Sequence, residues 1–284
     1  MLKQRIITAI VLVAVVLGCI FFLPLNLFTI VAALLVTAAG YEWGRFLCNK
    51  RAVCVVSAVV TLVIVAFSGG FVIEDIKLAT FNDKALELML SLSVLWWLFS
   101  VWMIAVYPRG TGFWFKSSWL KSFSGVLTLI PFYWAMVLVF APGNVDAPMH
   151  GGWGLLSVMV LVWVADSGAY FCGRALGKNK LAPKVSPGKT REGLAGGVVL
   201  AVIVAAIIGY CIGYRGHEMY VWLVSSLAAV LFSVVGDLTE SMFKREAGIK
   251  DSGQILPGHG GILDRIDSLT AALPVFVFFY RLLS

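Results

Sequence analysis

Charged residues are scarce in this sequence of 284 residues: they make up 13% of it, whereas hydrophobic residues make up 60%. A soluble chain of this length cannot bury so much apolar surface in one core, so a soluble globular protein is excluded. Lipid is the remaining solvent. The sequence therefore predicts an all-α protein, a polytopic bundle of membrane-spanning helices.

Cysteine and histidine are also scarce, with five and three residues. The cysteines form no Cys-x-x-Cys pair, which argues against a disulfide framework or a thiolate zinc site. His150 and His217 fall in loops without a partner, and we expect both to be surface residues. The sequence contains neither H-E-x-x-H nor G-x-S-x-G. Gly188-Lys189-Thr190 is not a P-loop, because the required upstream glycine is replaced by Pro183.

Nine long apolar runs are separated by short polar segments, which predicts about nine membrane-spanning helices. Lys3 and Arg5 before the first run resemble the start of a signal peptide. Another apolar run follows at once, so we expect the first run to be retained as a helix. The predicted helices cover residues 6–23, 27–40, 52–71, 86–106, 123–140, 153–172, 194–214, 220–237 and onward, and 262–280.

Lysine and arginine are unevenly divided between the two sides that these spans define. If the N-terminus is inside, only Lys77, Lys84, Arg215 and Arg281 of the 22 basic residues fall outside. Short loops rich in Lys and Arg face the cytoplasm, so the N-terminus is predicted to be cytoplasmic. No linker marks a soluble domain, and we predict one membrane domain, with N-terminal helices in 1–120 and the polar cluster in 121–284.

Polar residues are concentrated between the last two apolar runs, from Ser233 to Asp267. Asp237, Ser241 and Lys244 recur at helical spacing, which predicts that the eighth helix continues beyond its apolar part. Ionised groups at membrane depth are costly unless they are paired or solvated. We therefore expect the carboxylates of Asp237, Asp264 and Asp267 to be functional together.

Carboxylates on two helices suit Mg²⁺, which is often held by one or two carboxylates and by substrate phosphates. We predict Asp237 and Asp264 as metal ligands, with Asp267 as a third ligand or a support. Basic side chains would bind phosphate oxygens, and the amides that start the last helix would form an anion site. For any single basic residue, the alternative is that it only follows the charge bias of the loops. The basic candidates are Lys244, Arg245, Lys250, His259 and Arg265.

A second polar cluster lies in the basic loop 173–193, which the topology places on the same side. Lys189 and Arg191, where the seventh helix begins, are expected to bind phosphates of the nucleotide or the lipid. Attraction to anionic lipid is a close alternative for Lys178 and Lys180. Asp166, near the end of the sixth helix, either joins the polar centre or pairs with Arg174.

The polar stretch contains Ser241-x-x-Lys244-Arg245, then Lys250-Asp251, then Pro257-Gly258-His259-Gly260-Gly261, then Asp264-Arg265-x-Asp267. This long pattern of mixed residue types resembles the signature of the bacterial phosphatidate cytidylyltransferase (CDP-diacylglycerol synthase) family. Residues 165–170 and 184–193 are similar to that family as well. The first four helices resemble it only in length and hydropathy, apart from Glu42-Trp43.

The resemblance implies transfer of a cytidylyl group from CTP to phosphatidic acid with Mg²⁺, giving CDP-diacylglycerol and pyrophosphate for phospholipid biosynthesis. It also implies the bacterial inner membrane and a site that faces the cytoplasm. The attacking lipid phosphate is already an anion, so His259 is expected to orient a phosphate rather than act as a base. No nucleic-acid partner is expected, while a second, monovalent cation and a homodimer stay open.

The site residues that follow from the pattern and the resemblance fall into two groups. The expected catalytic residues are Asp237, Lys244, Arg245, Lys250, Asp251, His259, Asp264, Arg265 and Asp267. The expected substrate-binding residues are Asp166, Ser186, Lys189, Arg191, Ser241, Gly260 and Gly261.

Two other functions stay open at this point. A cation-coupled transporter would place its carboxylates near the middle of the bilayer and show repeat symmetry. Here the carboxylates follow the ends of apolar runs, and the sequence shows no internal repeat. A CTP-dependent polyprenol or phytol kinase would transfer a phosphoryl group instead of a nucleotidyl group.

Overall fold

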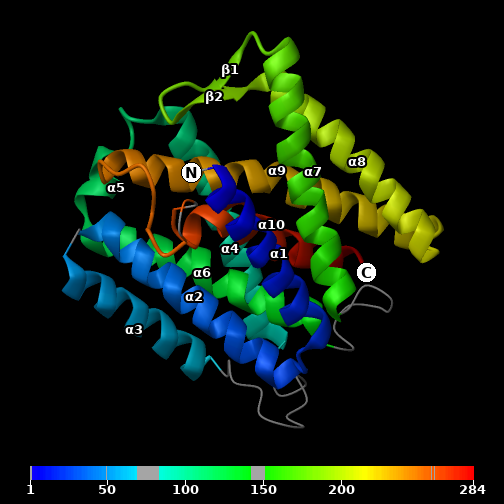
Figure 1. Ribbon diagram of the computed structural model, residues 1–284, viewed down its shortest axis with the longest axis horizontal. Helices are drawn as coiled ribbons and strands as arrows, with labels where there is room; N and C mark the ends of the chain where they lie inside the picture. The colour runs from blue at the N-terminus through cyan, green and yellow to red at the C-terminus, as the bar shows by residue number, and fades with distance from the viewer. Residues whose placement is uncertain (1, 49, 69–82, 142–150, 257, 259) are drawn as a thin grey trace. The chain divides into compact units, whose positions relative to one another are not determined.

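The computed structural model describes the chain except residues 1, 49, 69–82, 142–150, 257 and 259 (Figure 1). Helices dominate the described part, which confirms the all-α prediction. They are α1 (Leu2–Phe22), α2 (Leu25–Leu47), α3 (Arg51–Phe67), α4 (Asp83–Val106), α5 (Gly112–Lys116), α6 (Ser118–Phe140), α7 (Gly151–Leu176), α8 (Arg191–Ile212), α9 (Gly216–Glu246) and α10 (Leu263–Leu283). One hairpin joins α7 to α8 and consists of β1 (Lys180–Ala182) and β2 (Ser186–Thr190).

Each predicted apolar run corresponds to one of these helices, and residues 69–71 of the third run lie outside the described residues. By length and composition, seven helices in the described residues can cross a membrane, namely α2, α4 and α6 to α10. Two shorter apolar helices, Ile7–Phe22 and Arg51–Phe67, correspond to the first and third runs. The number of spans and their direction stay predictions. The eighth run continues as a helix to Glu246, as the spacing of its polar residues predicts.

The chain divides into two compact units, each built from separated segments. The first unit contains residues 1–89, 114–155 and 243–266, and the second contains 90–113, 156–242 and 267–284. The last residues of α9, from Phe243, therefore belong to the first unit. That the chain forms a single membrane domain stays a prediction.

In the first unit, α2 packs against α3 and α6. Glycines bring α2 and α3 together, because a Cβ on Gly44 would lie 2.5 Å from the Cα of Cys54. The rings of Phe28 and Phe140 stack with centroids 3.9 Å apart and join α2 to α6. Small residues allow such close helix packing where lipid provides no hydrophobic drive. This packing fixes the end of α2, where the polar residues of the unit begin.

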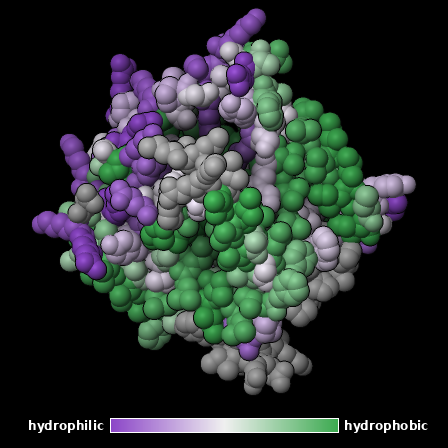
Figure 2. Space-filling model, in the orientation of Figure 1, coloured by the Kyte–Doolittle hydropathy of each residue, from purple (hydrophilic) through white to green (hydrophobic). Residues whose placement is uncertain are grey.

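In the second unit, α7 and α8 meet through glycines, since a Cβ on Gly197 would lie 2.4 Å from the carbonyl oxygen of Ala165. The hairpin was expected to be a loop. It is closed by Glu192, whose carboxylate accepts hydrogen bonds from the backbone and side chain of Asn179, while the Thr190 hydroxyl caps α8. Figure 2 shows hydrophobic side chains over α8 and hydrophilic ones over the hairpin, as expected where a membrane helix ends.

Candidate active site

Glu42 of α2 organises the polar part of the first unit. Its side chain is fully buried and accepts hydrogen bonds from the Ser252 hydroxyl at 3.1 Å, from Ile262 N at 3.0 Å and from Leu263 N at 2.7 Å. The last two amides begin α10, where the helix dipole favours a negative charge. Glu42 therefore caps α10 from a distant part of the chain.

Two glycines of the polar stretch make room for this carboxylate. A Cβ on Gly253 would lie 2.0 Å from Glu42 Oε1, and a Cβ on Gly261 would lie 2.4 Å from Glu42 Oε2. Real Cβ atoms do not approach other atoms so closely, so a larger residue would displace Glu42 or the loop. The glycine at 261 thus serves a contact inside the protein.

Asp264 lies on the first turn of α10 and is surrounded by donors. Oδ1 accepts from Lys244 Nζ at 2.8 Å, and Oδ2 accepts from Ser252 N at 3.0 Å and Gly261 N at 2.7 Å. The Lys244 and Asp264 side chains are 15% and 8% exposed, which makes this a largely buried ion pair. The structure thus brings together two residues that the sequence placed in one site.

These contacts bear on one expectation about the start of α10. The sequence predicted that its amides bind a phosphate, with Gly261 among the binding residues. The N–H groups of Gly261, Ile262 and Leu263 instead donate to Asp264 and Glu42. The anion at this helix end is the protein's own, so these amides hold the loop in place.

Phe243, the residue before Lys244, lies among aromatic rings. It contacts Trp43, Phe46 and Phe115 with ring centroids 5.0 to 5.8 Å apart. Arg45 Nη1 of α2 donates to the Ser252 carbonyl at 2.6 Å. The end of α9 and the loop of Ser252 therefore both contact α2.

The other predicted residues of the first unit lie at its surface or outside the description. Arg245, Lys250, Asp251 and Arg265 are exposed, and Gly260 bridges to Leu256 with a left-handed φ of +85°. Such a φ favours glycine. His259 lies outside the described residues.

In the second unit, Lys189 of β2 pairs with Asp237 of α9 at 2.5 Å. Both side chains are partly open, at 25% and 29% exposure, and the Ser241 hydroxyl donates to the other Asp237 oxygen at 3.3 Å. Asp166 of α7 lies within electrostatic range of both Lys189 and Asp237. The prediction left two options for Asp166, and this neighbourhood favours the polar centre.

The remaining candidates of the second unit surround this pair. Arg174 donates to the Tyr170 hydroxyl at 3.5 Å and forms no ion pair with Asp166 among the residues that the structure describes. Ser186 lies on β2, and Arg191 is exposed on the first turn of α8.

Asp267 lies where α9 and α10 approach each other within the second unit. A Cβ on Gly236 would lie 2.5 Å from the Asp267 carbonyl oxygen, so glycine permits this crossing beside Asp237. The Asp267 carboxylate accepts from Ser268 N at 2.7 Å. Two of the three carboxylates predicted to be functional are thus carried by neighbouring turns of crossing helices.

The donor chemistry at these carboxylates decides how well each fits a metal. Among the described residues, no group of three or more His, Cys, Asp or Glu is arranged to hold an ion. Asp237 fits a hard cation, because its oxygens are partly exposed and have one lysine and one hydroxyl as partners. Asp264 fits less readily, because its oxygens already accept from a lysine and two amides.

Sequence reasoning missed the importance of Glu42 and Ser252. The predicted helix 27–40 ends before Glu42, whereas α2 continues to Leu47 and includes it. A carboxylate inside an apolar helix is itself a signal for a polar partner. That partner lies 210 residues and more further along the chain, so no local pattern reveals it.

The whole chain is similar to known proteins. Residues 3–283 match the Cytidylyltransferase family. The chain is 41% identical to the phosphatidate cytidylyltransferase of Haemophilus influenzae, and the alignment covers 99% of both chains. It is also 41% identical to the phosphatidate cytidylyltransferase of Pseudomonas aeruginosa, over 97% of this chain and 96% of that one. Identity to the Bacillus subtilis phosphatidate cytidylyltransferase is 40% over 56% and 59% of the two chains.

Proposed function

Because the chain belongs to the cytidylyltransferase family, we propose that it transfers the cytidylyl group of CTP to phosphatidic acid. The products are CDP-diacylglycerol and pyrophosphate. The observation that carries this proposal is the similarity to phosphatidate cytidylyltransferases along nearly the whole chain. In the second unit, the pair of Lys189 and Asp237 lies beside the start of the apolar helix α8, where a lipid phosphate and a water-soluble nucleotide can meet.

In the proposed reaction, an oxygen of the lipid phosphate attacks the α-phosphorus of CTP. The bond from that phosphorus to the oxygen bridging to the β-phosphate breaks, and pyrophosphate leaves with the bonding electrons. Positioning and charge neutralisation accelerate such a transfer. In the second unit, Lys189 and Arg191 would bind phosphate oxygens. In the first unit, Lys244, which pairs with Asp264, is a further candidate for a phosphate contact.

The Lys189–Asp237 pair suits an exchange of partners. A partly exposed ion pair is opened at a lower cost than a fully buried one. Phosphate oxygens of CTP can replace Asp237 as the partner of Lys189, which leaves the Asp237 carboxylate for a cation.

We propose Mg²⁺ as that cation, with Asp237, Asp264 and Asp267 as the candidate ligands. When bound, Mg²⁺ would neutralise charge on the triphosphate. The partly open oxygens of Asp237 support its role best. We also propose the bacterial inner membrane as the location, with the active site facing the cytoplasm, from the charge bias of the loops.

The experiment uses purified protein, phosphatidic acid vesicles, Mg²⁺ and CTP labelled at either the α- or the γ-phosphorus. Label from α-labelled CTP in the lipid is expected, whereas label from γ-labelled CTP in the lipid would indicate a kinase. Asp237→Asn is expected to lower the transfer at least about 100-fold. Glu218→Gln, an exposed change on the first turn of the same helix, is the matched control. Wild-type activity in Asp237→Asn would remove Asp237 from the site.

A further inference from the structure

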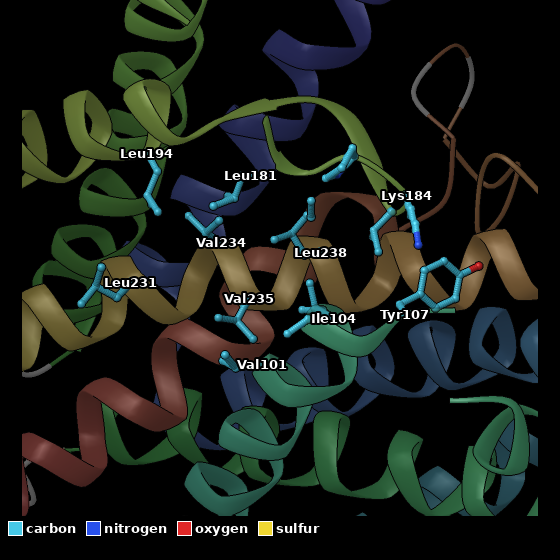
Figure 3. A pocket seen from close by; sticks show the side chains of 14 residues that line it. Val101, Ile104, Tyr107, Leu181, Lys184, Leu194, Leu231, Val234, Val235 and Leu238 are labelled. Atoms are coloured by element: carbon cyan, nitrogen blue, oxygen red, sulfur yellow. The ribbon is translucent and has the colours of Figure 1, made fainter. Parts of the chain in front are cut away.

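The second unit contains a cavity of about 430 Å³ beside α9. Its walls come from the end of α4, the hairpin, the start of α8 and one face of α9. Figure 3 shows Leu194 and Leu231 at one end and Lys184 and Tyr107 at the other. Most of the lining is aliphatic, including Val101, Ile104, Val234, Val235 and Leu238.

The lining favours an apolar occupant of the cavity. Among the lining residues that the structure describes, Lys184 and Tyr107 alone have polar side chains. The cavity is open, since Val101, Ala105 and Leu231 of its lining are exposed, so a hydrocarbon chain can enter it from the side. Such a chain contacts the aliphatic walls without leaving polar groups of its own unpaired.

The position of the cavity and the charge at its end indicate an occupant with an acyl chain and an anionic head group. Helix α4 ends at Val106 and α8 begins at Arg191, so two walls are made where apolar helices end. From Leu231 to Leu238 the α9 wall runs for about 10 Å. Lys184, at one end, is exposed and makes no hydrogen bond or ion pair with the residues that the structure describes. An apolar channel with a cation at its end matches an acyl chain attached to an anionic head group.

We propose that this cavity holds one acyl chain of phosphatidic acid, with Lys184 at the lipid phosphate, and that the cavity sets the chain length the enzyme prefers. The proposal rests on the proposed function. An acyl chain gains no hydrophobic free energy by leaving the bilayer for the cavity, because both are apolar. Selectivity must therefore come from fit, and a side chain that fills the cavity discriminates against long chains.

The test compares dioctanoyl and dioleoyl phosphatidic acid in mixed micelles. Ala105→Phe and Val235→Phe fill the cavity from α4 and from α9. Each is expected to lower the ratio of kcat/KM for the long lipid to that for the short lipid about tenfold. Ala85→Phe makes the same change at an exposed position of α4 outside the cavity and is expected to leave the ratio unchanged.

The outcomes separate this proposal from the proposed function. If wild-type protein labels neither lipid from α-labelled CTP, the proposed function fails. If the wild-type protein is active and the filled variants keep its ratio of kcat/KM for the long lipid to that for the short lipid, the chain-length proposal is overturned. It is also overturned if the filled variants lose activity toward both lipids equally, which is the result expected when a bulk phospholipid occupies the cavity. Should the Phe variants fail to fold, Val235→Ala enlarges the cavity and is expected to raise the ratio instead.

Lys184→Gln tests the polar end. The KM for phosphatidic acid is expected to rise about tenfold, the scale of a hydrogen bond to a charged group, with the KM for CTP unchanged. A rise in the KM for CTP alone would assign Lys184 to the nucleotide and contradict the proposal.

Discussion

Replacing Glu42 is expected to disrupt the protein more than its place at the end of an apolar helix suggests. Its carboxylate accepts from Ser252 Oγ, Ile262 N and Leu263 N. In Glu42→Ala all these buried donors lose their acceptor, at about 1–3 kcal/mol each. The sum approaches the whole stability of an ordinary domain, so Glu42→Ala is expected not to accumulate as folded protein.

Glu42→Gln keeps the shape but turns an NH₂ group toward N–H donors. A loss of about 2–3 kcal/mol follows, which corresponds to a Tm about 5–10 °C lower. Cytidylyl transfer is expected to fall as well, because Ser252 also holds Asp264. Thermal unfolding in detergent and the CTP assay measure both, with Glu218→Gln as the control. A Tm and an activity equal to those of the wild type would refute the assignment of Glu42 as the cap of α10.

Three further predictions follow from the same contacts and from the charge bias. Gly253→Ala and Gly261→Ala are expected to lower the Tm, because the new Cβ meets Glu42, whereas Gly112→Ala, where nothing lies within 4 Å, is expected to leave it unchanged. A variant with Cys48 as its single cysteine is expected to react with an impermeant maleimide in inverted vesicles and not in intact cells. The reason is that this exposed thiol follows α2 on the predicted cytoplasmic side. The opposite result would reverse the predicted topology. EDTA is expected to stop the transfer and Mg²⁺ to restore it, and a rate indifferent to EDTA would exclude the proposed metal.

The helices were predictable because lipid imposes a simple rule on sequence: an apolar run long enough to cross the bilayer must be helical. The sequence also placed Lys244 and Asp264 in one site, since both lie in the same polar stretch, but it gave them separate roles and did not predict their ion pair. Contacts made across long separations did not. Glu42 meets the start of α10 from 220 residues away, and only the folded chain shows that the helix-start amides are already occupied.

The hairpin between α7 and α8 is a second feature that the sequence did not predict. Its short strands carry Pro187 and Gly188, which are typical of loops. Pairing between Lys180 and Thr190 and the carboxylate of Glu192 hold it together. A sequence pattern of glycine, proline and lysine predicts polarity and phosphate binding, but it does not predict this geometry, which places Lys189 against Asp237.

Cytidylyl transfer by this protein is tested by following the label from CTP into the lipid. With α-labelled CTP, phosphatidic acid and Mg²⁺, the wild-type protein is expected to produce labelled CDP-diacylglycerol and equimolar pyrophosphate, and Asp237→Asn to produce almost none. Label that reaches the lipid only from γ-labelled CTP, or full transfer by Asp237→Asn, would contradict the account.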